Sequence, residues 1–112
     1  MFDRAAELRR KRNHLQALRE EFAQQRETCR AITGRISTYG MQLRALNVQA
    51  VAANRPYLND RHEHLAAHHQ ALKAEKAACT AALADLRQQI AMLDRQIRDE
   101  EATLLHRGRR TR

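Results

Sequence analysis

The chain has 112 residues and a net charge of +8, and 18 of its 21 basic residues are arginines. Three glycines and one proline are too few turn residues for a sheet protein, and abundant Ala, Leu, Arg, Gln and Glu are typical of long helices. No apolar run approaches the roughly 18 residues that cross a bilayer, and residues 1–4 lack the apolar core of a signal peptide. We therefore expect a cytoplasmic protein without membrane insertion.

A heptad repeat dominates the first half of the chain. Asp3 suits the N-cap position of a helix, with Glu7 in its first turn. An apolar residue then recurs at every seventh position, and a second series lies three residues further on, with polar exceptions at Lys11 and Gln25. The two series are Leu8, Leu15, Phe22, Cys29, Ile36 and Leu43, and Leu18, Ile32, Tyr39 and Leu46. This pattern is the a/d seam of a coiled-coil helix, which we place at about residues 3–53.

The stretch Thr33–Gly40 is the weakest part of that helix. Its two glycines cost roughly 1 kcal/mol each relative to alanine. Ile36 and Tyr39 nevertheless keep the heptad phase, which a loop has no reason to preserve. We favour a continuous helix here over a break.

A turn is predicted at about residues 54–59. Pro56 removes a backbone donor and disfavours helical geometry at Arg55. Either Pro56 is the first residue of the second helix, or Asp60 caps that helix and Glu63 completes a capping box.

The second helix, at about residues 60–106, has a seam of its own, and the basic tail 107–112 falls outside the pattern. The members of this seam are Leu58, Leu65, Leu72, Cys79, Leu86 and Leu93, and His62, His69, Lys76, Leu83, Ile90, Ile97 and Leu104. Two matching stripes joined by a short turn predict one all-α domain over residues 1–112. We expect an antiparallel two-helix coiled-coil hairpin, a long rod with arms of about 70 Å.

The two cysteines help to set the register of the hairpin. A turn centred near residues 54 and 55 places Cys29 beside Cys79, both in the seam. A disulfide fits this arrangement, but we favour two small, unbonded core residues because the cytosol is reducing.

Basic residues gather at the open end of the predicted hairpin. Residues 1–56 carry a net charge of +6 and residues 57–112 a net charge of +2. In the predicted register, Glu100 and Asp99 lie near Arg9 and Arg10. Arginine binds carboxylate and phosphate, so an acidic protein surface and nucleic acid are both candidate partners. The candidate partner-binding residues are Arg9, Arg10, Lys11, Arg12, Arg107, Arg109, Arg110 and Arg112.

Histidines cluster near the start of the second helix. His64 and His68 are one turn apart and could ligate a divalent ion with a third group. Leu65 stands where the metalloprotease motif has its glutamate, so that motif is not matched. Because His62 and His69 occupy seam positions, we favour a polar stretch of seam over a metal site. We expect no metal and no other cofactor.

The sequence contains no catalytic signature. It has no glycine-rich phosphate loop, no nucleophile beside a plausible base and no paired carboxylates suited to a cleft. We expect a non-enzymatic protein.

A small, basic hairpin of two long helices resembles the stalk proteins of flagellar and type III secretion export ATPases, the FliJ/YscO type. The stretch Leu8-Arg9-Arg10-Lys11-Arg12-Asn13-His14-Leu15 is similar to the N-terminal arm of that family. The resemblance covers most of the chain but offers no sharp motif, so it assigns no functional residue. It implies a protein-transport role, with the rod seated in or beside a hexameric ATPase or another secretion component.

The sequence thus predicts a coiled-coil interaction or assembly protein, most concretely such a stalk. The alternative is a nucleic-acid-binding hairpin whose arginines contact phosphates. A homo-oligomer that pairs two hairpins as a four-helix bundle is a third architecture.

Overall fold

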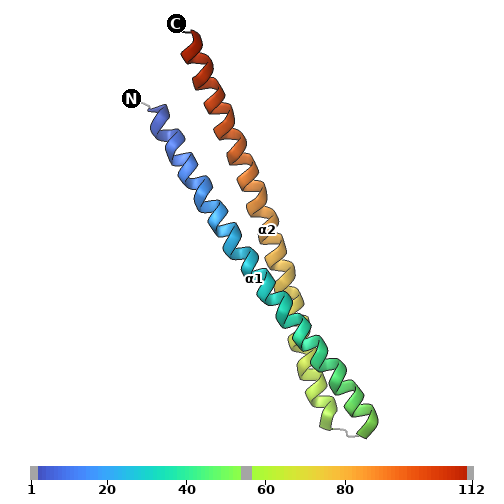
Figure 1. Ribbon diagram of the computed structural model, residues 1–112. Coiled ribbons are helices and arrows are strands. Elements are labelled where there is room, and N and C mark those ends of the chain that lie inside the picture. Colours follow the sequence, from blue (N-terminus) through green and yellow to red (C-terminus); the bar gives the residue numbers. More distant parts are fainter. Residues whose placement is uncertain (1–2, 54–56, 111–112) are drawn as a thin grey trace. The chain divides into compact units, whose positions relative to one another are not determined.

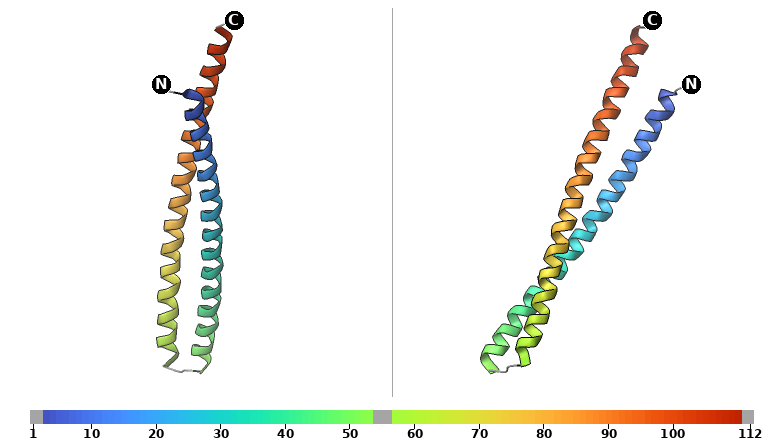
Figure 2. Two further views of the ribbon diagram at one scale, coloured as in Figure 1. Left: turned by 90° about the vertical axis from the view of Figure 1, so that its left-hand side faces the viewer. Right: turned by 180° about the vertical axis from the view of Figure 1, so that it is seen from behind.

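The computed structural model describes residues 3–53 and 57–110, and the side chains of residues 3–48 and 60–107. These residues form two helices, α1 (Arg4–Ala53) and α2 (Tyr57–Arg110), as Figure 1 shows. The helices run in opposite directions in both views of Figure 2. The predicted all-α fold with two antiparallel helices is confirmed. Over the described residues, neither helix has an apolar stretch long enough to cross a membrane.

The N-terminus of α1 is capped as the sequence predicts. One carboxylate oxygen of Asp3 accepts hydrogen bonds from the backbone N–H groups of Ala5 and Ala6, at 3.1 and 3.3 Å. The backbone carbonyl of Asp3 accepts a further bond from the N–H of Glu7 at 3.1 Å. These bonds satisfy donors that a helix leaves unpaired in its first turn.

The start of α2 differs from one of the two predictions. Asp60 lies within the first turn of α2, so it is not the cap. There its negative charge still interacts favourably with the positive end of the helix dipole. Residues 54–56, including Pro56, are outside the described part. At its other end α2 continues through Arg107 to Arg110, because arginine is a good helix former.

Helix α1 passes through Thr33–Gly40 without a break, as predicted. The hydroxyl of Thr33 donates to the carbonyl oxygen of Cys29 at 2.9 Å, and the hydroxyl of Thr38 donates to that of Gly34 at 3.1 Å. Both bonds reach the carbonyl oxygen four residues earlier in the chain, so each side-chain hydroxyl is satisfied while the helix continues.

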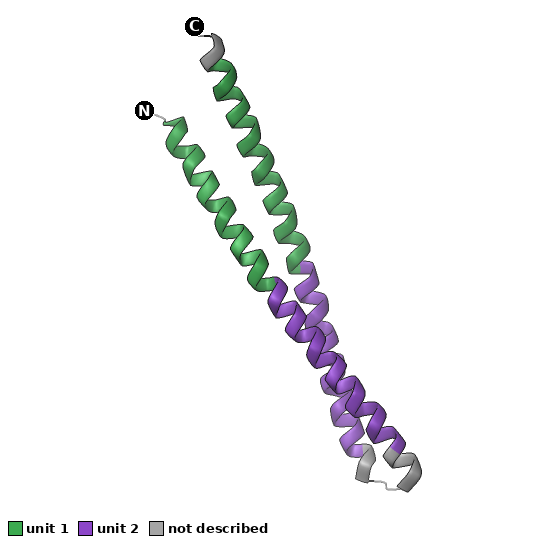
Figure 3. Cartoon of the chain, in the orientation of Figure 1, with its two compact units in different colours: residues 1–25, 82–112 green, residues 26–81 purple. Residues whose placement is uncertain are grey.

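The chain divides into two compact units, which Figure 3 colours separately. Unit 1 consists of residues 1–25 and 82–112, and unit 2 consists of residues 26–81. Each unit contains a segment of α1 packed against a segment of α2.

The core of unit 1 follows the predicted seam. Leu8, Leu15 and Ile97 are buried together, and partly buried leucine and isoleucine side chains pack around them. Those surrounding residues are Ile90, Leu93 and Leu104. Leu18 and Leu86 are also buried. Arg87 lies over the ring of Phe22, with its guanidinium carbon 5.6 Å from the ring centre.

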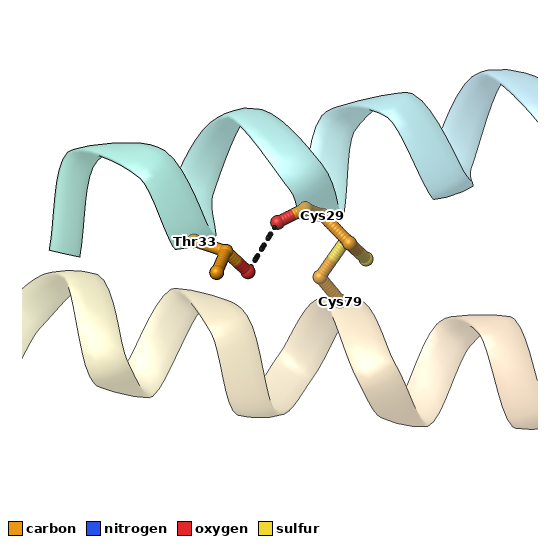
Figure 4. The surroundings of a disulfide bond; sticks show 3 residues. All are labelled: Cys29, Thr33 and Cys79. Carbon is orange, nitrogen blue, oxygen red and sulfur yellow. Dashed lines mark hydrogen bonds between the residues drawn. A yellow bond between two sulfur atoms is a disulfide. The ribbon is translucent and has the colours of Figure 1, made fainter. Parts of the chain in front are cut away.

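In unit 2 the seam contains a covalent bond between the helices. Cys29 and Cys79 form a disulfide with a Cα–Cα distance of 5.8 Å, drawn in Figure 4. The prediction of two unbonded thiols is therefore wrong, although the predicted pairing of these residues is correct. The antiparallel register brings their Cα atoms within the range that a disulfide requires. Leu46 and Leu72 are buried in the same unit.

Candidate interaction surfaces

Two of the candidate basic residues are engaged within unit 1. The ammonium of Lys11 donates a hydrogen bond to Glu100, and Glu7 lies 3.7 Å from it. The hydrogen bond to Glu100 raises the pKa of Lys11 above its ordinary value of 10.5, against a smaller opposing effect of desolvation. Arg12 donates through Nε to Glu101 at 3.1 Å. These pairs link α1 to α2 and leave Lys11 and Arg12 less available to a partner.

The predicted pairing of Arg9 and Arg10 with Glu100 and Asp99 is wrong. At about 100° per residue, Arg9 and Arg10 lie on the side of α1 away from buried Leu8, whereas Lys11 and Arg12 fall within about 60° of it. The acidic residues of α2 therefore meet the second pair of basic residues. Arg9 and Arg10 are exposed and make no ion pair within the described part of the chain.

The C-terminal candidates are only partly described. Arg107 is exposed, and it already takes part in an interaction within the chain. Arg109 and Arg110 belong to α2, but their side chains are outside the described part, as is all of Arg112. Of the eight predicted partner-binding residues, Arg9 and Arg10 are therefore the two whose described side chains are exposed and remain available to a partner.

A second stripe of uncharged residues, missed in the sequence analysis, runs along α1 in unit 2. Its members alternate at spacings of three and four, and all of them are exposed; they are Ala31, Gly34, Thr38, Met41, Ala45 and Val48. Met41 is 62% exposed and Val48 is 70% exposed. Gly34 and Thr38 lie about 160° round the helix from the seam residue Ile36. We call these six residues the outer stripe.

The outer stripe has the spacing of a coiled-coil seam and small residues along much of its length. A Cβ atom added at Gly34 would have no neighbour within 4 Å. The polar group of Thr38 is satisfied by its bond to the carbonyl of Gly34. The stripe therefore presents alkyl groups to the surroundings, and its small residues permit a close approach.

The histidines of α2 separate into two pairs in unit 2. His62 and His69 are half-buried at the seam, and a Cβ atom at Gly40 would lie 3.6 Å from Nε2 of His69. His64 and His68 are exposed, with 3.3 Å between their Nε2 atoms. The predicted seam positions of His62 and His69 are confirmed. Among the described residues, no group of three or more His, Cys, Asp or Glu side chains could hold a metal ion.

A scan against protein-family models and searches of curated proteins and solved structures find no match to this sequence. The likeness to export-ATPase stalks consequently rests on the two-helix antiparallel architecture.

Proposed function

We propose that this chain is a non-enzymatic interaction or assembly protein that binds a helix of a protein partner along the outer stripe. The observation that carries the proposal is the exposure of Met41 and Val48 on a face with heptad spacing. A helix with apolar residues on one face needs one partner to cover them. In unit 2, α1 has two such faces, and α2 covers the face that contains Ile36.

The size of the stripe limits how it can bind. Full burial of a valine or methionine side chain contributes about 1.5–3 kcal/mol, whereas association costs at least about 4 kcal/mol in lost motion. Met41 and Val48 alone therefore at most offset the lower bound of the cost of association. A stable complex needs further contacts beside the stripe.

Charge beside the stripe indicates what those contacts are. The sequence between Thr28 and Asn59 contains no acidic residue, and exposed Arg35 and Arg44 flank the stripe. Their positive charge favours a partner helix whose apolar residues are bordered by Asp or Glu, because opposite charges steer association and fix the register.

The most concrete form of this proposal is the stalk component of a type III secretion or flagellar export ATPase. It is supported by the antiparallel two-helix architecture, the basic composition and the arginine-rich stretch at residues 8–15. In this form the partner helix belongs to the ATPase or to another component of the secretion apparatus.

Affinity capture from the native host, with and without nuclease, tests the proposal. We expect the wild-type chain to retain a protein partner after nuclease treatment. The double variant Met41→Glu/Val48→Glu should lose that partner, because it places two carboxylates on the binding face. Met92→Glu is the matched control, since Met92 is 58% exposed and lies in unit 1.

The proteins and nucleic acid recovered in this experiment distinguish the export-ATPase stalk from a nucleic-acid-binding hairpin. An ATPase or secretion component among the retained proteins supports the stalk. Retention of the same partner by the stripe variant would overturn the assignment of the outer stripe. Recovery of nucleic acid, with all protein lost after nuclease, would favour the nucleic-acid-binding alternative.

A further inference from the structure

The pair His64 and His68 stands apart from the seam and from the outer stripe. The two residues are one turn apart on α2, and both are exposed in unit 2. Their ring centres are 4.7 Å apart, with an interplanar angle of 78°, and their Nε2 atoms are 3.3 Å apart. The two ring nitrogens thus lie within hydrogen-bond distance of each other at the surface of α2.

That separation matches the spacing of two ligands on one zinc ion. Zinc binds histidine nitrogen at about 2.0–2.1 Å with tetrahedral geometry, which places two ligand nitrogens about 3.3–3.4 Å apart. Ligands at a right angle would instead be about 2.9 Å apart at the same bond length. We propose that His64 and His68 bind a zinc ion through their Nε2 atoms.

Helix α1 holds one of the two ligands in place. The ring of Tyr39 stacks on that of His68, with ring centres 5.9 Å apart and an interplanar angle of 22°. Tyr39 is itself half-buried in the seam of unit 2. The stack restricts the rotation of the His68 ring, so less motion is lost when the metal binds.

The pair supplies two of the four ligands of a tetrahedral ion. No third His, Cys, Asp or Glu joins the two histidines within the described ranges. Water or a ligand from another molecule therefore fills the remaining two positions. Zinc displaces protons from imidazole, so binding weakens as the pH falls.

Calorimetric titration of the full chain with zinc chloride tests the proposal. The protein is kept oxidised, so that the thiols of Cys29 and Cys79 do not compete for the metal. We expect one zinc ion per chain. Removal of a residue that hydrogen-bonds to a metal ligand typically weakens metal binding by about 10–100-fold. His64→Ala and His68→Ala remove a ligand itself, so each should weaken zinc binding at least tenfold.

Three further variants test whether zinc binding depends on His64 and His68 in particular and on the ring of Tyr39. His69→Asn alters the neighbouring histidine and should leave zinc affinity unchanged. Tyr39→Phe keeps the stack and should also leave it unchanged, whereas Tyr39→Leu should weaken binding. Circular dichroism verifies that each variant remains helical, and zinc-induced shifts of the His64 and His68 ring resonances locate the metal by NMR.

The proposal fails if wild-type protein binds no zinc, which would leave the pair as two hydrogen-bonded imidazoles. It also fails if His69→Asn lowers the affinity as much as His64→Ala, because the metal would then belong to the histidine cluster as a whole.

Discussion

Reduction of the Cys29–Cys79 disulfide should destabilise unit 2 by several kilocalories per mole. The two cysteines are separated by 50 positions in the sequence. In the chain-entropy description, a cross-link that closes a loop of this length stabilises the folded state by about 4 kcal/mol at 25 °C. Small domains unfold with about 5–15 kcal/mol, so this loss is a large part of the total. Unit 2 depends on the bond because its two α-helical segments share a narrow seam.

Urea unfolding of the same protein with and without a reducing agent measures this effect. Helical circular dichroism gives the free energy of unfolding, and amide hydrogen exchange should show the largest acceleration within residues 26–81. A Cys29→Ala/Cys79→Ala variant under non-reducing conditions is the control for side effects of the reductant. A decrease below about 1 kcal/mol would refute the reasoning, because typical disulfides contribute about 2–4 kcal/mol. Two free thiols in the unreduced protein would refute the bond itself.

Three other substitutions test the packing and the ion pairs. Leu86→Asp should lower the stability of unit 1 by at least about 3 kcal/mol, because Leu86 is only 7% exposed. Leu105→Asp is the control, since Leu105 is 64% exposed, and it should have little effect on the helical signal. Equal effects of the two substitutions would contradict the assignment of Leu86 to the seam. Gly34→Ala should raise the free energy of unfolding, measured in urea, by up to about 1 kcal/mol, since a Cβ atom at this position meets nothing within 4 Å. A lower free energy of unfolding would reveal a neighbour at this site. Lys11→Met should remove a pH-dependent contribution: the raised pKa means that the stabilisation is present below pH 10.5 and is lost as the pH rises through the raised value. Unfolding midpoints of wild type and Lys11→Met should therefore converge at high pH, and a constant difference would argue against the ion pair.

The sequence predicts the fold well because the fold follows from one physical rule, the heptad spacing of apolar residues along each helix. Heptad spacing identifies Leu8, Leu15, Leu72 and Leu86 as seam residues, and all four are buried. Continuity of α1 through Thr33–Gly40 follows from the same phase. Periodicity is a property of the backbone geometry, so it survives two glycines and several polar substitutions.

The details that the sequence does not predict depend on choices between local alternatives. A matched pair of cysteines fits both two thiols and a disulfide. The redox environment decides between them, and the amino-acid sequence does not specify that environment. The partners of Lys11 and Arg12 depend on which side of α1 each residue faces, and the register of the hairpin alone does not give that angle. Element boundaries, such as the position of Asp60 within α2, are likewise set by single turns.

The outer stripe was missed because most of its members are small. Ala31, Gly34 and Ala45 carry little apolar surface, so a search for large apolar residues passes over them. The available signal was the seven-residue spacing of Gly34, Met41 and Val48, which becomes meaningful once Ile36 is known to lie on the opposite side of the helix.

Site-specific photo-crosslinking in the native host tests the central claim most directly. A photoreactive amino acid replaces Met41 in one variant and Met92 in another, and adducts are identified by mass spectrometry. The proposed role predicts a protein adduct of defined mass at position 41 that is absent at position 92. No adduct at position 41, or the same adducts at both positions, would contradict a partner helix on the outer stripe.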